Sequence, residues 1–292
     1  MSSHEAPSVF LNGRVMAASD ARLEVDDVGF LHGANVFTTL AARHGKPFRL
    51  DRHLARLART AGQLGLKVRV DATELTAATT DLLAANALDR ARLRITLSAG
   101  SIRTGEAMTL VTAVPLPQYP PAWFTEGITV AVSHYRQWPA DPTYGHKTGN
   151  YLTRILARRA AAEQGAEEAL WFTPKTGGIT RLAEGCFTNV FLMAGGRLRT
   201  PALDTPVLPG VTREAVIEVA AGLGIDCDAE AVLTIDDVLA AEEIFLTAST
   251  MGVVPVSHVR DHAVGTGRPG ELTLRLRSAY ESLVDSDTAP DN

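Results

Sequence analysis

One lysine of this 292-residue chain stands in a setting that could do covalent chemistry. Lys147 precedes Thr148 and Gly149, and Tyr151 follows it by four positions. If a helix begins near Thr148, the lysine and the phenol lie near one face of its first turn. An amine held beside a phenol and a positive helix end can form a Schiff base with an aldehyde. The alternative is a solvated surface lysine, so other features of the chain must decide between the two.

Three further stretches carry polar groups that fit the same chemistry. Glu184 ends a strand expected at 179–183, although an exposed glutamate at a strand end is also an ordinary feature. The run Leu208–Arg213 places a glycine before a helix whose first amides and Thr212 hydroxyl could hold a phosphate. An ordinary helix cap is an equal alternative there. The stretch Thr247–Gly252 is a hydroxyl-rich loop after a strand.

The bulk composition excludes several classes of protein. The chain has 28 basic and 33 acidic residues and a net charge of −5, so it lacks the basic excess of a nucleic-acid-binding protein. It has no apolar run of the roughly 20 residues that a membrane span requires. Its two cysteines and scattered histidines indicate neither a disulfide framework nor a zinc or other metal site. A reducing cytoplasm is the expected location.

The N-terminal part of the chain predicts a small sheet with two helices. Asn12-Gly13 between two apolar runs is a hairpin turn, because both positions favour positive φ. Asp51 is expected to cap the first helix, and Asp71 with Glu74 has the spacing of an N-terminal cap for the second. Four prolines between 115 and 121 mark a linker, which divides the chain into domains 1–120 and 121–292. Further strands are expected at 36–42, 93–97 and 108–114.

The C-terminal part is richer in strands. A helix is expected after Pro209-Gly210, a short one from Ile235, and an amphipathic one at 272–283. The polar tail 286–292 is expected to be disordered. Strands are expected at 128–132, 169–173, 179–183, 189–193, 198–200 and 243–247.

Taken together and in order, these motifs resemble the class IV (fold type IV) pyridoxal-phosphate enzymes. That family includes branched-chain aminotransferases, D-amino-acid aminotransferases and aminodeoxychorismate lyases. The resemblance covers most of the chain, from the Asn12-Gly13 hairpin to the last helix. It is most specific in Lys147-x-x-Asn150-Tyr151, Glu184-Gly185-x-x-x-Asn189-Val190-Phe191 and Leu208-Pro209-Gly210-Val211-Thr212-Arg213.

The resemblance implies a mixed α/β (α+β) fold with two domains. These are a small α/β sandwich and a larger β-rich, barrel-like domain with helices, with pyridoxal 5′-phosphate held at their interface. Lys147 resembles the Schiff-base lysine and Glu184 the carboxylate that keeps the pyridine nitrogen protonated. Tyr151 resembles the residue that hydrogen-bonds the cofactor's phenolic oxygen. The remaining implied cofactor contacts are the phosphate arginine Arg56 (with Arg52 and Arg59 as nearby alternatives), Leu208 against the ring, and Val211, Thr212 and either Ser249 or Thr250 at the phosphate.

The choice within the family depends on a few residues. Phe37-Thr38-Thr39 departs from the branched-chain enzymes, which usually carry glutamate where Thr38 stands, and resembles the lyases. The Gly-Asn-Tyr that ends at Tyr151 matches aminotransferases. The Arg-x-His pair of D-amino-acid enzymes is missing, since Arg103 has no histidine two positions later. The expected substrate residues are His32, Phe37, Thr39, Arg94 and Tyr135, and Arg94 has a surface charge as its alternative.

The resemblance therefore implies an aminotransferase that acts on a small apolar amino acid and a 2-oxo acid. Lys147 would move the substrate's α-proton as general base. An aminodeoxychorismate lyase, which releases pyruvate, is the second reading, and a D-amino-acid aminotransferase is a further one. A catalytically silent binding or structural protein is the alternative from another class, and the joint presence of Lys147, Tyr151 and Glu184 argues against it. Family enzymes are homodimers, so a homodimer is expected, with no nucleic-acid or membrane partner.

Overall fold

The computed structural model describes residues 7–175 and 177–290. The chain divides into two compact units. Unit 1 comprises Met1–Pro117, Lys147–Asn150 and Val284–Asn292. Unit 2 comprises Gln118–His146 and Tyr151–Leu283. Within the described ranges, no helix is both long enough and apolar enough to cross a membrane.

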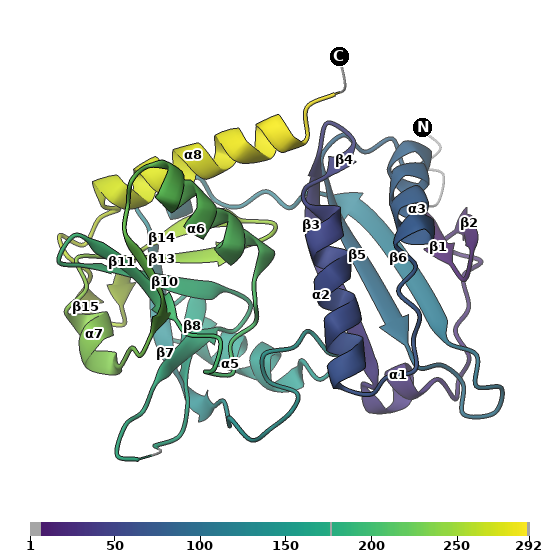
Figure 1. Ribbon diagram of the computed structural model, residues 1–292, viewed down its shortest axis with the longest axis horizontal. Coiled ribbons are helices and arrows are strands. Elements are labelled where there is room, and N and C mark those ends of the chain that lie inside the picture. The colour runs from purple at the N-terminus through teal and green to yellow at the C-terminus, as the bar shows by residue number, and fades with distance from the viewer. Residues whose placement is uncertain (1–6, 176, 291–292) are drawn as a thin grey trace. The chain divides into compact units, whose positions relative to one another are not determined.

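Unit 1 is a six-stranded antiparallel sheet with helices packed against one face (Figure 1). Its strand order is β2-β1-β6-β5-β3-β4. The Asn12-Gly13 turn joins β1 to β2 with φ of 47° and 84°, so the expected hairpin is confirmed. The elements are β1 (Ser8–Leu11), β2 (Arg14–Ala17), α1 (Val28–His32), β3 (Asn35–Arg43), β4 (Lys46–Pro47), α2 (Leu50–Gln63), α3 (Ala72–Ala85), β5 (Ala91–Ser98) and β6 (Met108–Pro115).

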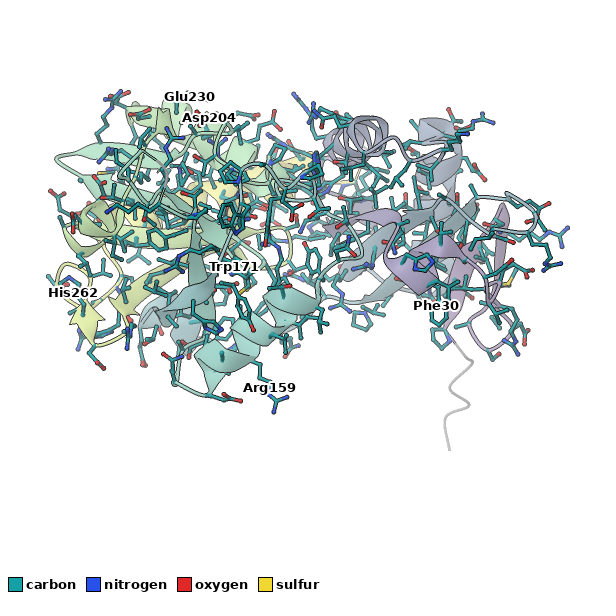
Figure 2. All side chains as sticks on the ribbon, turned by 90° about the horizontal axis from the view of Figure 1, so that it is seen from below. Phe30, Arg159, Trp171, Asp204, Glu230 and His262 are labelled. Atoms are coloured by element: carbon teal, nitrogen blue, oxygen red, sulfur yellow. The ribbon has the colours of Figure 1, made fainter. Side chains whose placement is uncertain are left out.

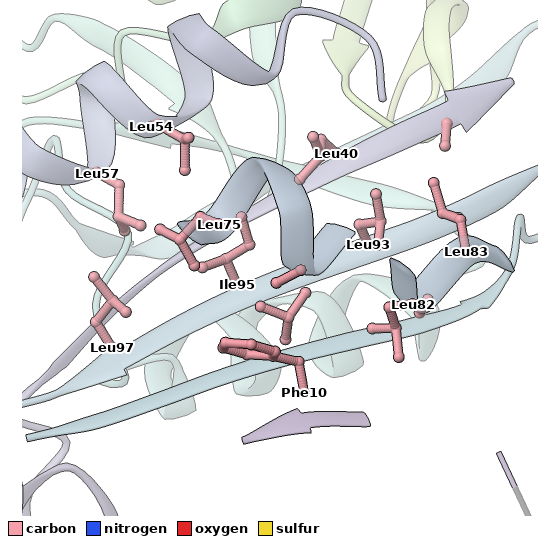
Figure 3. Packing of buried hydrophobic residues seen from close by; sticks show 14 of the residues in the cluster. Phe10, Leu40, Leu54, Leu57, Leu75, Leu82, Leu83, Leu93, Ile95 and Leu97 are labelled. Carbon is pink, nitrogen blue, oxygen red and sulfur yellow. The ribbon is translucent and has the colours of Figure 1, made fainter. Parts of the chain in front are cut away.

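The core of unit 1 lies between this sheet and helices α2 and α3. Successive strand residues point to opposite faces, so Leu93, Ile95 and Leu97 of β5 enter the core. Figure 3 shows these three side chains facing the leucines of α2 and α3. The other face of β5 carries the exposed Arg92 and Arg94. The alternation of β5 therefore leaves Arg92 and Arg94, on the face away from the core, available to contact a ligand.

Unit 2 is built on a nine-stranded mixed sheet. Its order is β12-β11-β10-β13-β14-β7-β8-β9, with β15 paired to β14. Because β9, at one end of this order, also packs near β10 and β11, the sheet curls toward a half-barrel. The elements are α4 (Ala122–Thr125), β7 (Ile128–Arg136), α5 (Leu152–Ala162), β8 (Glu168–Phe172), β9 (Leu182–Gly185), β10 (Asn189–Ala194), β11 (Arg197–Pro201), α6 (Val211–Gly222), β12 (Cys227–Ala231), α7 (Ile235–Leu239), β13 (Glu243–Ala248), β14 (Gly252–Val259), β15 (His262–Ala263) and α8 (Glu271–Asp287).

The helix expected to begin near Thr148 begins later, so that prediction is wrong. Helix α5 starts at Leu152, with Tyr151 at its N-cap. Residues before it are extended and pair with β3, where Val36 bridges Thr148. Strand β4 pairs only with the far end of β3, so the near end of that edge is open to this segment. Lys147 and Tyr151 consequently do not share a helical turn.

Two expectations about helix ends are also wrong. Arg49, in the left-handed conformation with φ of 49°, is the N-cap of α2 in place of Asp51. The expected disordered tail is helical as far as Asp287, where α8 ends. Asp287 pairs with Arg49 at 3.5 Å, which gives the start of the tail a fixed partner, and Asp285 just before the tail pairs with Arg43 at 2.7 Å. Residues 291–292 of the expected tail lie outside the described part.

Candidate active site

Lys147 lies on the short extended segment that pairs with β3. The Phe37 amide donates to the Lys147 carbonyl at 2.9 Å, and the Gly149 amide donates to the Asn35 carbonyl at 3.1 Å. A Cβ on Gly149 would come within 2.5 Å of Asn35 Nδ2, so the approach of the two segments requires glycine there. The half-buried lysine places Nζ 5.5 Å from the centre of the Phe37 ring. Pairing with β3 thus fixes the backbone from which the Lys147 side chain extends.

An arginine completes the same face of the unit 1 sheet. Arg94 lies opposite Thr39 in the β3–β5 register, and its guanidinium carbon is 3.6 Å from the Phe37 ring centre. Its Nε donates to Thr96 Oγ1 at 3.1 Å. Four predicted residues, Lys147, Phe37, Thr39 and Arg94, are therefore gathered on one face. His32 is exposed at the end of α1, and within the described ranges no hydrogen bond or ring contact joins it to this face.

On the helix side of β3, Arg56 belongs to a buried polar network. Its Nη2 donates to Thr38 Oγ1 at 2.9 Å, and Thr38 Oγ1 lies 2.7 Å from His53 Nδ1. Arg56 Nη2 also lies 3.4 Å from His53 Nδ1. Arginine only donates, so the tautomer with the ring proton on Nε2 lets Nδ1 accept from both Arg56 and Thr38. Burial lowers the pKa of His53 well below its usual value, and the charges of Arg56 and Lys147 lower it further. The neutral ring and the hydroxyl hold the Arg56 guanidinium in one orientation.

The sequence reading did not identify His53. It stands three positions before Arg56 and one turn from it, a spacing that puts both on the buried face of α2. The available signal was a histidine among the leucines of the buried face of α2, one turn before Arg56.

In unit 2, Glu184 is a buried carboxylate with three hydrogen-bond donors. Its side chain is 4% exposed. Oε1 accepts from Arg154 Nη2 at 2.6 Å and from Gln137 Nε2 at 2.9 Å. Oε2 accepts from the Leu208 amide at 2.9 Å. These contacts fix the carboxylate in one position beside a guanidinium.

Arg154 and Gln137 were missed by the sequence reading. Arg154 stands on α5, three positions after Tyr151, and also donates to the carbonyls of Gly185 and Cys186 at 3.2 and 2.8 Å. Burial alone would lower the pKa of Arg154, but the charge and hydrogen bond of Glu184, together with the nearby Tyr151 and Cys186, raise the pKa of the guanidinium on balance. A charged residue on an amphipathic helix resembles a solvated one in sequence, so only the spacing from Tyr151 hinted at its role.

The turn that follows Glu184 is held by a second buried carboxylate. Glu168 Oε1 accepts from the amides of Ala169 and Cys186, and Oε2 accepts from the Phe187 amide. Phe187 stacks on the Tyr151 ring with the ring centres 5.6 Å apart. This turn therefore positions the phenol of Tyr151 as well as Glu184.

Cys186 is a buried packing residue of unit 2. Its sulfur accepts from Trp171 Nε1 at 3.2 Å, and burial raises the pKa of the thiol. Trp171 faces the inner side of α5, whereas Arg159 projects from the outer side of that helix (Figure 2). Tyr135 of β7, an expected substrate residue, stacks on Trp171 with the ring centres 5.8 Å apart and is half-buried.

The loop before α6 connects Glu184 to a helix N-terminus. The Leu208 carbonyl accepts from Asn189 Nδ2 at 2.9 Å, and a Cβ on Gly210 would lie 2.0 Å from Asn189 Oδ1. Glycine at 210 lets the loop pass this close to the asparagine. Helix α6 begins at Val211, and its N-cap Gly210 has no side chain to cap the first amides, which include that of the buried Thr212. Such an end attracts an anion.

Ser249 and Thr250 lie in the turn between β13 and β14. Thr250 Oγ1 is 2.8 Å from Tyr119 OH, and both Ser249 and Thr250 are partly exposed. Thr247, at the end of β13, buries a hydroxyl that has no partner among the described residues. The turn thus presents several hydroxyl groups.

The expected site residues fall into two groups, one in each compact unit. Unit 1 provides an amine over an aromatic ring and two arginines, one of them held by a buried network. Unit 2 provides a fixed carboxylate, a phenol and an uncapped helix N-terminus. The unit 1 residues are His32, Phe37, Thr39, Arg56, Arg94 and Lys147, and those of unit 2 are Tyr135, Tyr151, Glu184, Leu208, Val211, Thr212, Ser249 and Thr250.

The chain is similar to known proteins in sequence. The family described as amino-transferase class IV matches residues 35–259. A putative branched-chain-amino-acid aminotransferase from Methanocaldococcus jannaschii is 29% identical over 283 residues, which cover 94% of this chain and 96% of that protein. An aminodeoxychorismate lyase from Bacillus subtilis is 30% identical over 291 residues, 94% of each chain.

A solved structure is also similar over nearly the whole chain. It is the branched-chain amino acid aminotransferase of Escherichia coli, which matches with a TM-score of 0.89 and 28% identity. The match covers 98% of this chain and 97% of that one. The mixed α+β fold expected from the sequence is therefore confirmed.

Proposed function

The chain belongs to the class IV aminotransferase family, and we propose that it is a pyridoxal 5′-phosphate-dependent aminotransferase for small apolar amino acids. A 2-oxo acid such as 2-oxoglutarate accepts the amino group. The observation that carries the proposal is the buried Glu184 carboxylate, which three donors fix beside the loop that leads to the uncapped start of α6. A carboxylate for a ring nitrogen and amides for a phosphate are what this cofactor needs from a protein.

The residues present fit that cofactor. A carboxylate offers about four acceptor positions, and the described contacts of Glu184 use three, two on Oε1 and one on Oε2. One position on Oε2 thus remains for a ring N–H. When bound, pyridoxal phosphate supplies an aldehyde for a covalent link and a protonated ring that withdraws electrons from the substrate. The amides of Val211 and Thr212, with the oriented guanidinium of Arg56, suit its phosphate.

The other residues of the site have distinct tasks in this proposal. Lys147 Nζ would hold the cofactor's aldehyde carbon in a covalent link. Once the substrate's amino group has displaced it, the freed amine would take the proton from the substrate's α-carbon and return it one carbon away. Tyr151 would donate to the cofactor's phenolic oxygen, and the Phe187 stacking holds its ring for this. Leu208 would lie against the ring. Either Ser249 or Thr250 adds a hydroxyl at the phosphate, and the existing Tyr119 bond of Thr250 favours Ser249.

We assign substrate binding to the face of unit 1 that carries Lys147. Arg94 is exposed enough to receive a carboxylate and is held in place by Phe37. Phe37 gives an apolar side chain a surface to contact, and Thr39 lies beside Arg94. His32 and Tyr135 remain proposed pocket residues.

Aminodeoxychorismate lyase is the second candidate function. Thr38 stands where branched-chain enzymes usually carry glutamate, and the segment Phe37-Thr38-Thr39 resembles the lyases, which supports a site of the lyase type. The identities to the Methanocaldococcus jannaschii relative and to the lyase, 29% and 30%, do not separate the two. A D-amino-acid aminotransferase is a further alternative, which the missing Arg-x-His pair disfavours.

A donor panel without acceptor separates these functions. The purified protein is loaded with pyridoxal phosphate and mixed with single L- and D-amino acids while its visible absorbance is recorded. An aminotransferase converts the cofactor to the pyridoxamine form with its preferred donor, and we expect this with branched-chain L-amino acids. Conversion only with D-amino acids would make it a D-amino-acid enzyme. Conversion with none, together with pyruvate release from aminodeoxychorismate, would make it the lyase.

We further propose that the protein is a homodimer, because the enzymes it resembles are homodimers. We also propose that it is located in the cytoplasm. The domain limits 1–120 and 121–292 also remain a proposal. Light scattering of the purified protein tests the dimer, and a monomer that is fully active would refute it.

A further inference from the structure

Arg154 is a buried cation that the proposed chemistry does not use. We propose that it is a positioning residue that supplies the counter-charge of Glu184 and thereby weakens the hold of this carboxylate on a cationic ring nitrogen. This inference rests on the proposed function, because the ring nitrogen is that of pyridoxal phosphate.

The guanidinium of Arg154 is held from three sides. Nη2 donates to Glu184 Oε1 at 2.6 Å, while Nη1 donates to the carbonyls of Gly185 and Cys186. The side chain is 10% exposed and that of Glu184 is 4% exposed, so solvent does little to screen the pair. A planar guanidinium with a fork of donors suits this geometry, and a lysine cannot make all these contacts at once.

The carboxylate therefore carries a partner cation before any ligand arrives. Because Gln137 and Arg154 both donate to Oε1, the position left for a ring N–H is on Oε2, beside the Leu208 amide. A protonated ring nitrogen there would be a second cation on one carboxylate. Arg154 and that nitrogen then compete for the same negative charge, so the ring proton is held less strongly than it would be by Glu184 alone.

This competition affects the stability of the protein, which can be measured independently of turnover. Without Arg154, the buried Glu184 charge lacks this counter-ion until the cofactor binds. Removal of Arg154 should therefore cost more stability in the cofactor-free protein than in the loaded protein. A purely structural arginine, which only holds the Gly185–Cys186 turn, would cost the same in both.

The test compares melting temperatures with and without pyridoxal phosphate for R154Q, R154K and R159Q. The last variant is a control on the same helix, since Arg159 is exposed and pairs with the exposed Glu163. We expect the cofactor to raise the melting temperature of R154Q by about 4 °C or more beyond its effect on the wild type. R154K keeps the charge, so its gain should return to the wild-type value even if its overall stability is lower.

The double variant E184Q/R154Q tests whether the effect passes through Glu184. Its cofactor-induced gain should equal that of E184Q alone, because the charge that Arg154 balances is gone. This comparison does not use R154Q alone, so it still tests the inference if that variant folds poorly. Equal gains for R154Q and the wild type, or an extra gain that persists without Glu184, would overturn the inference alone. A wild-type protein that gains nothing from pyridoxal phosphate would refute the proposed function and this inference with it.

Discussion

Replacement of Glu184 by glutamine tests the electrostatics of the site. Glutamine has nearly the same shape, but one of its two terminal groups is an NH₂ that can only donate. At the Oε1 position that group would face the donors of Arg154 and Gln137, and at the Oε2 position it would face the Leu208 amide. Either orientation sets donor against donor and leaves Arg154 buried without this carboxylate.

The expected loss of stability is large because both partners are buried. Removing one member of a buried ion pair costs about 3–5 kcal/mol, since the remaining charge loses its compensation. The side chains are 10% and 4% exposed, so no discount for solvent screening applies. A mere loss of one neutral hydrogen bond would cost about 1 kcal/mol. We therefore expect E184Q to lower the free energy of unfolding of the cofactor-free protein by about 3–5 kcal/mol.

Urea unfolding, followed by tryptophan fluorescence, measures this loss. The matched control is E163Q, because Glu163 pairs with Arg159 at 3.3 Å but both side chains are more than half exposed. Its loss should stay below about 0.5 kcal/mol. A loss for E184Q as small as that of the control would show that the carboxylate is not the buried counter-ion described here.

Two further predictions concern the phosphate loop and the buried histidine. Gly210→Ala would put a methyl group 2.0 Å from Asn189 Oδ1, so we expect at least tenfold weaker binding of pyridoxal phosphate in a fluorescence titration; unchanged affinity would contradict the assigned role of this loop. His53 has a depressed pKa in the folded protein, so the unfolded chain takes up its proton first and stability falls as the pH drops through about 6.5. His53→Asn should remove a slope of about 1 kcal/mol per pH unit between about pH 6.5 and 5.5 in urea unfolding, and an unchanged slope would count against the neutral ring.

The sequence predicted features that depend on neighbours in the chain. The Asn12-Gly13 turn, the Asp71 cap whose side chain accepts from the Glu74 amide, and the alternation of β5 all follow local rules and are confirmed. The family resemblance is also confirmed, because its motifs are short and each is local.

Features that depend on distant pairing were not predicted. The strand-like pairing that takes the place of a helix turn at Thr148 depends on an open edge of β3, which is more than 100 residues away in sequence. The helix α1 is only five residues long, too short to show a period. Arg154 looks like a solvated charge until the fold brings Glu184 beside it, and sequence spacing cannot show that the partner is 30 residues downstream.

Lys147 is the residue on which the proposed function depends most, as the amine that binds the cofactor covalently. The protein loaded with pyridoxal phosphate can be reduced with borohydride, digested and mapped by mass spectrometry, with Lys147→Ala treated in parallel. We expect the cofactor's mass on the peptide that contains Lys147, and neither this adduct nor visible absorbance nor turnover in the variant. An adduct on another lysine, or a variant that retains absorbance and turnover, would contradict the assigned role of Lys147.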